Sequence, residues 1–314
     1  MDSLVLALPN GAAVTGLINL PSLTPATPKH RPFLVCLHGG TYSSSYFDPP
    51  GQSIKGVSDA LGVPVVAIDR AGYGGSSLFG INGVVPEGST YFEEEGNWLH
   101  DLVLPALWES YAVPHRLTCL VLLTHSMGTP PGIVAMARQS VEVKGGQGKR
   151  YIAGGVILSG WGFTPPPQTD ENPPSGAAPS RPTRFNIPQK DIAMLGRPED
   201  NLCDPHIYSL NQSLGTDMAF DEVDHGRRLW FNKAKGFTEQ IALPIFYALG
   251  QYDLLWPPSE QEPHACESSF PNSPKVEGGV LLNAPHCAEL GYQGIAWYVK
   301  AFGFALECAG SFKP

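Results

Sequence analysis

The stretch LTCLVLLTHSMGTPPG, residues 117–132, joins an apolar run to a serine and then to a segment with helical spacing. A short, nearly continuous apolar run is typical of a strand buried on both faces, as in a parallel sheet. A sharp turn from strand through Ser126 to helix would expose the hydroxyl at a helix N-terminus, and the small Gly128 gives that turn room to close. The alternative is a serine that only caps the helix, which is common.

Runs of the same kind recur along the chain, at residues 33–37, 63–68, 153–158, 245–249 and 276–282. Segments with helical spacing alternate with them, at residues 92–108, 127–139 and 292–306. Alternating strands and helices imply right-handed crossovers and a doubly wound sheet. Near the N-terminus, two apolar runs joined at Asn10-Gly11 predict a hairpin, because both residues tolerate positive φ. We therefore expect an α/β fold with a doubly wound, mostly parallel sheet of about eight strands.

Residues 162–240 interrupt this alternation. They are rich in Pro, Gly, Ser and Asn, carry short amphipathic pieces at 191–195 and 220–231, and are too long for an ordinary connection. Such a segment is either a disordered insert or a lid. Its aromatic content favours a packed lid: Trp161, Phe163, Phe185, Tyr208, Phe220, Trp230 and Phe231. We therefore predict an α/β core of residues 1–161 and 241–314, with residues 162–240 forming an inserted, mainly helical cap.

The ends of three further strands carry residues suited to acyl chemistry. The loop His38-Gly39-Gly40-Thr41 follows the run at 33–37, and its glycines would let backbone N–H groups point toward an oxyanion. Asp253 follows the run at 245–249 and could orient an imidazole, or it could cap a helix beginning near Pro257. His286 follows the run at 276–282 and could be a general base, or a structural residue at a strand–helix junction.

The order Ser126, Asp253, His286, each after a predicted strand, is the chain order of the α/β-hydrolases. On these residues the chain resembles that family, and specifically its single-chain esterase and lactonase-like members with a cap. The resemblance covers both ends of the chain but not the insert. It implies a catalytic triad in which Ser126 is the nucleophile, His286 the general base and then acid, and Asp253 the group that orients His286.

The resemblance also implies an oxyanion hole made by the backbone N–H groups of Met127 and of Gly40 or Thr41. The loop from Asp69 to Ser76 looks like the family's D-x-x-G-x-G-x-S loop, which is structural. We expect His38 to hold its own loop and His125 to pack beneath the nucleophile. Two features depart from the family pattern: Thr124 replaces the first glycine of G-x-S-x-G, and Thr129 with two prolines replaces the usual small residues after it.

These residues predict a carboxylic ester hydrolase that cleaves an apolar small-molecule ester or lactone through an acyl-enzyme, without a cofactor. Trp161, Tyr252 and Trp256 could line the substrate pocket, although packing in the core or the lid explains them almost as well. The same fold and triad can also serve a lyase, an acyl transferase or a cyclase. A ligand-binding, receptor-like protein on this scaffold is the remaining alternative, and it predicts a damaged triad or very slow turnover.

The composition excludes several other classes. The 314 residues carry a formal charge of −9, which argues against nucleic-acid partners and anionic membranes. The six cysteines show no CxxC spacing, so a zinc site is not predicted. The N-terminus lacks the features of a secretory signal, and no apolar run approaches the roughly 20 residues that span a bilayer. We expect a cytoplasmic monomer or homodimer that holds no metal.

Overall fold

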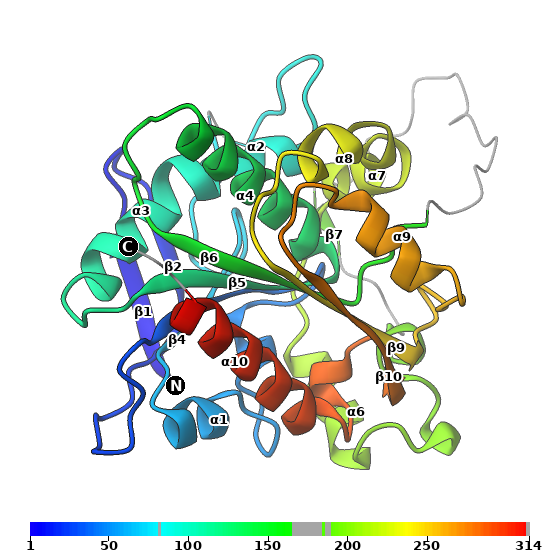
Figure 1. Ribbon diagram of the computed structural model, residues 1–314. Coiled ribbons are helices and arrows are strands. Elements are labelled where there is room, and N and C mark those ends of the chain that lie inside the picture. Colours follow the sequence, from blue (N-terminus) through cyan, green and yellow to red (C-terminus); the bar gives the residue numbers. More distant parts are fainter. Residues whose placement is uncertain (81–82, 165–183, 186–189, 312–314) are drawn as a thin grey trace.

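An eight-stranded sheet forms the centre of the computed structural model, which describes residues 1–80, 83–164, 184–185 and 190–311 (Figure 1). The strand order is β1-β2-β4-β3-β5-β6-β9-β10, with β1/β2 and β2/β4 antiparallel and the other pairs parallel. This confirms the expected α/β class and mostly parallel sheet. The strands are β1 (Asp2–Ala7), β2 (Ala13–Asn19), β3 (Pro32–Leu37), β4 (Val65–Ile68), β5 (Cys119–His125), β6 (Ala153–Ser159), β9 (Ile245–Tyr252) and β10 (Val276–Pro285).

The hairpin of β1 and β2 turns at the expected place. Gly11 has a φ of 82°, and the N–H of Leu8 donates to the carbonyl of Ala12 over 2.8 Å to close the turn. The strands β3 to β6 are buried along their whole length, as their continuous apolar character predicts.

Helices cover both faces of the sheet (Figure 1). The helices α2 (Tyr91–Trp98), α3 (Leu104–Leu107) and α4 (Thr129–Lys144) lie on one face, and α1 (Lys55–Leu61) and α10 (Gly294–Ser311) lie on the other. Each face has its own apolar core, one around Phe92 and Val134 and the other around Trp297 and Phe302.

The segment expected as one helix at 92–108 is interrupted. Its α-helical turns are separated by a π-helical turn at Leu99–Val103, and a second π-helical turn follows at Trp108–Ala112. Pro105 lies in α3, where it lacks the N–H that would bond four residues back. A widened turn just before a proline accommodates that missing bond, and spacing alone does not reveal it.

The described part of the insertion contains helices and two short strands. The strands were not expected, because a two-residue pair leaves no pattern in the sequence. Its elements are β7 (Arg184–Phe185), α5 (Asp191–Leu195), the 3-10 turn Pro198–Asp200, α6 (Pro205–Ser213), β8 (Met218–Ala219), α7 (Phe220–Arg228) and α8 (Trp230–Thr238). Residues 165–183, the Pro-rich part of the predicted lid, and the side chain of Phe185 lie outside the described residues.

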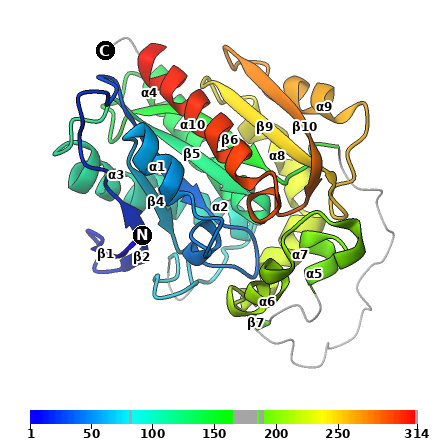
Figure 2. The ribbon, with the colours of Figure 1, turned by 90° about the horizontal axis from the view of Figure 1, so that it is seen from below.

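The described part of the insertion packs into both cores. Ile207 and Leu214 belong to the core beneath α10, whereas Trp230 belongs to the core beneath α4. The insertion helices gather beyond the carboxyl ends of β5 and β6, as Figures 1 and 2 show from two directions. The division into a core and a cap at residues 162 and 240 remains a prediction.

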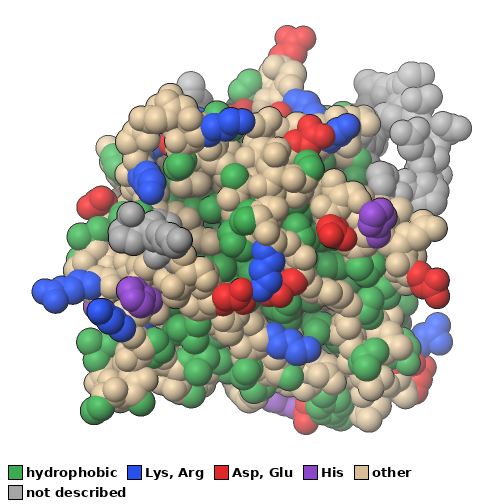
Figure 3. All heavy atoms as spheres, in the orientation of Figure 1, with side chains coloured by type: hydrophobic (Ala, Val, Ile, Leu, Met, Phe, Trp, Pro, Cys, Tyr) green, Lys and Arg blue, Asp and Glu red, His purple; other side chains and the backbone are tan. Residues whose placement is uncertain are grey.

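The surface shows no concentration of basic charge on the face in Figure 3, where Lys and Arg side chains are scattered among acidic and apolar ones. Within the described residues, no helix has the length and apolar character needed to cross a membrane.

Candidate active site

Ser126, His286 and Asp253 form one hydrogen-bonded chain. The Oγ of Ser126 lies 3.0 Å from Nε2 of His286, and Nδ1 of His286 lies 2.8 Å from Oδ2 of Asp253. All three residues are buried, with Ser126 the most exposed at 7%. Residues far apart in the sequence therefore meet in the arrangement that activates a serine hydroxyl.

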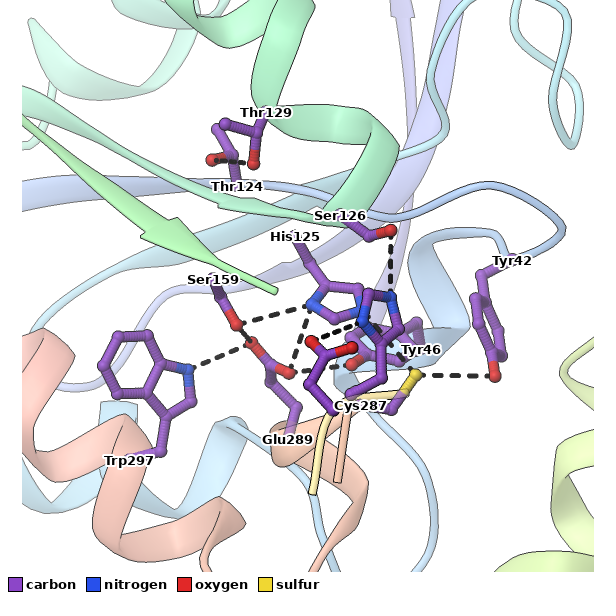
Figure 4. A network of polar contacts seen from close by, with 12 residues as sticks. Tyr42, Tyr46, Thr124, His125, Ser126, Thr129, Ser159, Cys287, Glu289 and Trp297 are labelled. Carbon is purple, nitrogen blue, oxygen red and sulfur yellow. Dashed lines mark hydrogen bonds and ion pairs between the residues drawn. The ribbon is translucent and has the colours of Figure 1, made fainter. Parts of the chain in front are cut away.

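Ser126 occupies a strained turn at the end of β5 (Figure 4). Its φ is 50°, and the 3-10 turn Ser126–Gly128 leads into α4. A Cβ on Gly128 would lie 2.7 Å from the carbonyl oxygen of His38, so only glycine fits there. Left-handed backbone at a serine costs free energy and is typical of a nucleophile held for attack.

Thr124 fits in place of the usual glycine because α4 carries Gly132 opposite it. The Cγ2 methyl of Thr124 lies 2.7 Å from the position that a Cβ of Gly132 would take, so it occupies the space left by the missing side chain. Its Oγ1 lies 3.0 Å from Oγ1 of Thr129 and donates to the carbonyl of Ile157 over 3.1 Å. The two departures from the family pattern thus bond to each other.

We expect Gly132→Ala to destabilise the fold by about 1–3 kcal/mol, because the added methyl would overlap the methyl of Thr124. Urea unfolding measures the loss. Thr124→Ser removes only the opposing methyl and keeps the hydroxyl, so the double variant should recover most of the stability. A double variant no more stable than Gly132→Ala alone would contradict this account of the turn.

Asp253 does not cap a helix, since the next helix, α9 (Glu262–Ser269), begins nine residues later. Its Oδ1 accepts from the N–H groups of Leu255 and Trp256 over 2.9 and 2.8 Å, while Oδ2 faces His286. One oxygen therefore anchors the carboxylate to its loop and the other orients the imidazole.

The loop of Gly39, Gly40 and Thr41 runs beside the serine. A Cβ on Gly39 would lie 3.0 Å from Cβ of Ser126, and one on Gly40 would lie 2.7 Å from Sδ of Met127. Thr41 is fully buried with a φ of 61°. This close approach of backbone to nucleophile is the setting that an oxyanion hole needs.

His38 holds this loop from behind, as expected. Its Nδ1 donates to the carbonyl of Gly39 over 2.8 Å, and its Nε2 accepts from the N–H of Arg70 over 3.1 Å. Burial, aided by the nearby Arg70 guanidinium, lowers the pKa of His38 well below its usual value. The imidazole therefore stays neutral, in the tautomer that both bonds require.

The sequence matches the alpha/beta hydrolase family over residues 34–288. The chain belongs to this family. No protein of curated function matches the sequence significantly.

Solved structures share the alpha/beta hydrolase fold at low sequence identity. A monoacylglycerol lipase from Paleococcus ferrophilus is 15% identical with a TM-score of 0.52, over 89% of this chain and 96% of the lipase. A thermophilic esterase from Thermogutta terrifontis is 14% identical with a TM-score of 0.53, over 98% of this chain and 100% of the esterase. An alpha/beta hydrolase fold protein from Nakamurella multipartita is 15% identical with a TM-score of 0.52, over 99% and 100% of the two chains.

Near the hydrogen-bonded residues Ser126 and His286 of this alpha/beta hydrolase lies a buried carboxyl group, Glu289, that the sequence did not indicate. It accepts hydrogen bonds from Ser159 Oγ at 2.7 Å, Tyr46 Oη at 2.8 Å and Trp297 Nε1 at 3.0 Å (Figure 4). Burial raises the pKa of Glu289, and these donors oppose the rise. Its position three residues after His286 was the available signal, but a carboxyl in a short turn is usually exposed.

His125 lies between this carboxyl and the triad, as Figure 4 shows. Its ring stacks on Tyr46 at 4.8 Å and lies 5.0 Å from the ring of His286. Burial lowers the pKa of His125 well below its usual value, so the imidazole is neutral. The expected packing role beneath the nucleophile agrees with these contacts.

Arg70 links the insertion to the turn that carries Ser126. It is fully buried and donates to Glu95 of α2 over 2.8 Å, to Glu222 of α7, and to the carbonyl of Met127 over 3.3 Å. Tyr73 donates to the other oxygen of Glu222 over 2.5 Å. Burial and the nearby Glu222 raise the pKa of Glu95 to about 7, although Arg70 opposes the rise.

The aromatic residues expected near the substrate separate into two groups. Trp161 and Trp256 lie 4.9 Å apart between ring centroids, and both contact Phe231 of α8. Tyr252 lies apart from them at the end of β9 and is 47% exposed to solvent. Trp161 also packs against Phe92. The side chains of Phe92 and Met127 both lie next to Gly226, so the aromatic cluster extends to Met127.

Two methionine sulfur atoms lie next to Gly40, in the loop beside Ser126. A Cβ on Gly40 would lie 2.7 Å from Sδ of Met127 and 3.0 Å from Sδ of Met218, which comes from β8 of the insertion. Within the described part of the chain, no group of three His, Cys, Asp or Glu is arranged to hold a metal ion.

Proposed function

We propose that this chain is a serine hydrolase that cleaves a carboxylic ester or lactone of an apolar small molecule through an acyl-enzyme on Ser126. The observation that carries the proposal is the continuous chain of hydrogen bonds from Ser126 Oγ through His286 to Asp253, inside a buried site. Hydrogen bonds of this kind are strengthened where water is excluded.

This geometry supports the following reaction. Nε2 of His286 takes the proton from Ser126 as Oγ attacks the carbonyl carbon, and the imidazolium is stabilised by Asp253. The carbonyl oxygen becomes an oxyanion, for which backbone N–H groups of Met127 and of Gly40 or Thr41 are the proposed donors. His286 then protonates the leaving alcohol, and a water molecule activated by His286 releases the acid from the serine.

The surroundings of the serine support an apolar substrate. Met127 and Met218 border the site, and the cluster of Trp161, Trp256 and Phe231 continues from it. Thioether and aromatic groups favour apolar ligands through burial of surface and aromatic contacts. Two of the proteins of similar fold are a monoacylglycerol lipase and an esterase, in keeping with this proposal.

Labelling with a fluorophosphonate probe and intact-mass detection tests the nucleophile. The native protein should gain one adduct, and Ser126→Ala should gain none. Ser268→Ala is the matched control, because Ser268 also contacts a histidine, at 3.4 Å from His264, but on the exposed surface; it should keep the adduct. A native protein that takes no adduct, or an adduct that persists in Ser126→Ala, would refute the proposal.

Turnover in oxygen-18 water tests the second half of the reaction. Hydrolysis places one labelled oxygen in the released acid. If the product carries no oxygen-18 although Ser126 reacts with the fluorophosphonate probe, the same nucleophile would instead serve acyl transfer or cyclisation.

A further inference from the structure

Thr41, in the loop beside the nucleophile, has a backbone conformation that its side chain disfavours. Its φ of 61° lies in the left-handed region, where a β-branched residue is a rare exception. Such a conformation persists only when the surroundings impose it, and it is found most often at functional sites.

Two groups of the insertion hold Thr41 in place. Nζ of Lys190 donates to the carbonyl of Thr41 over 3.0 Å, and the backbone N–H of Thr216 donates to the same carbonyl over 2.9 Å. Next to it, the hydroxyl of Tyr42 donates to Asn211 of α6 over 2.7 Å. The loop is therefore bonded to the insertion at two successive residues.

Lys190 is an unusual residue for this place. It is only 5% exposed, and its ammonium group lies 4.0 Å from the centre of the Tyr42 ring. Among the described residues, no carboxylate forms a salt bridge with it, and burial lowers its pKa, although the Asp191 carboxylate opposes the lowering. A buried cation without a carboxylate partner costs stability, which points to a role in the site rather than in folding.

We propose that Lys190 is a positioning residue: its hydrogen bond to the Thr41 carbonyl keeps Thr41 left-handed, and so keeps the N–H groups of residues 40 and 41 aimed at the oxyanion. The inference rests on the proposed function. If Lys190 has this role, the insertion stabilises the transition state through the loop of Gly39, Gly40 and Thr41.

Hydrolysis of p-nitrophenyl hexanoate by Lys190→Met tests this. We expect kcat to fall on the order of 10- to 100-fold, with KM changed less than about threefold, because a misaligned donor affects the transition state more than the bound ester. Lys190→Gln keeps an N–H donor without the charge, so it should retain more of kcat than Lys190→Met. Lys300→Met, which removes an exposed lysine of α10, is the control for loss of charge and should leave both constants unchanged.

The variant Thr41→Gly tests whether Lys190 acts through the backbone conformation of residue 41 or whether its loss disturbs the site in general. Glycine adopts a left-handed backbone without help, so the bond to Lys190 should matter little in that background. Whatever the activity of Thr41→Gly itself, adding Lys190→Met to it should lower kcat by less than about threefold. Thermal unfolding of each variant confirms that it is folded.

Two results would overturn the inference alone: native turnover that depends on Ser126 but not on Lys190, or a full loss from Lys190→Met in the Thr41→Gly background. Turnover that survives Ser126→Ala would instead overturn the proposed function, and this inference with it.

Discussion

Asp253→Asn is expected to lower kcat about 10⁴-fold while leaving the protein folded. Oδ1 of Asp253 accepts two backbone hydrogen bonds, from Leu255 and Trp256, and only an oxygen can do so. The asparagine oxygen must therefore stay on that side, and its NH₂ group then faces Nδ1 of His286. Nδ1 has to become the acceptor, which moves the imidazole proton to Nε2, where it can no longer accept the proton of Ser126.

Steady-state hydrolysis of p-nitrophenyl hexanoate measures this loss, and thermal unfolding checks the fold. Asp204→Asn is the matched control, since Asp204 also accepts from a backbone N–H, that of His206 at the start of α6, but contacts no member of the site. It should keep full activity. A loss of less than about tenfold in Asp253→Asn would mean that Asp253 does not set the tautomer of His286.

Arg70→Met should lower the free energy of unfolding by about 3–5 kcal/mol, because it leaves Glu95 and Glu222 as buried carboxylates without their cation. It also removes the bond to the Met127 carbonyl. Urea unfolding at neutral pH measures the change. The loss should be accompanied by detachment of α7, which Glu222 binds to the core.

Two controls separate charge burial from loss of packing. Arg70→Met with Glu95→Gln and Glu222→Gln removes all three charges and should recover a large part of the loss. Arg138→Met breaks an ion pair with Asp101 in which both side chains are more than a third exposed, and should cost no more than about 1 kcal/mol. Equal losses for Arg70→Met and Arg138→Met would show that burial does not govern the effect.

The strands, and the meeting of Ser126, Asp253 and His286 at one place, could be predicted because each leaves a local pattern. The run ending at Leu123 is almost entirely apolar, and Ser126, Asp253 and His286 each follow such a run, so topology alone brings them to the same edge of the sheet. The fit of Thr124 against Gly132 also lies within one short segment, although only the structure shows that the two residues face each other.

The contacts made by the insertion could not be predicted in this way. Lys190 lies 149 residues from Thr41, and Glu222 lies 152 residues from Arg70. Residues 162–240 have no continuous periodicity that would fix the path of the chain. Whether a lysine or a glutamate in such a segment faces solvent or a buried partner depends on that path, and a solvated charge is the more common outcome.

The attachment of the insertion to both cores limits how substrate preference could be changed by protein engineering. Grafting a cap from another hydrolase in place of residues 162–240 would remove Ile207 from one apolar core and Trp230 from the other. It would also leave Arg70 and Tyr42 without their partners Glu222 and Asn211. Exchange of the whole segment is therefore a redesign of the folded enzyme, and new specificity is more readily reached by single substitutions at Met218 or Phe231.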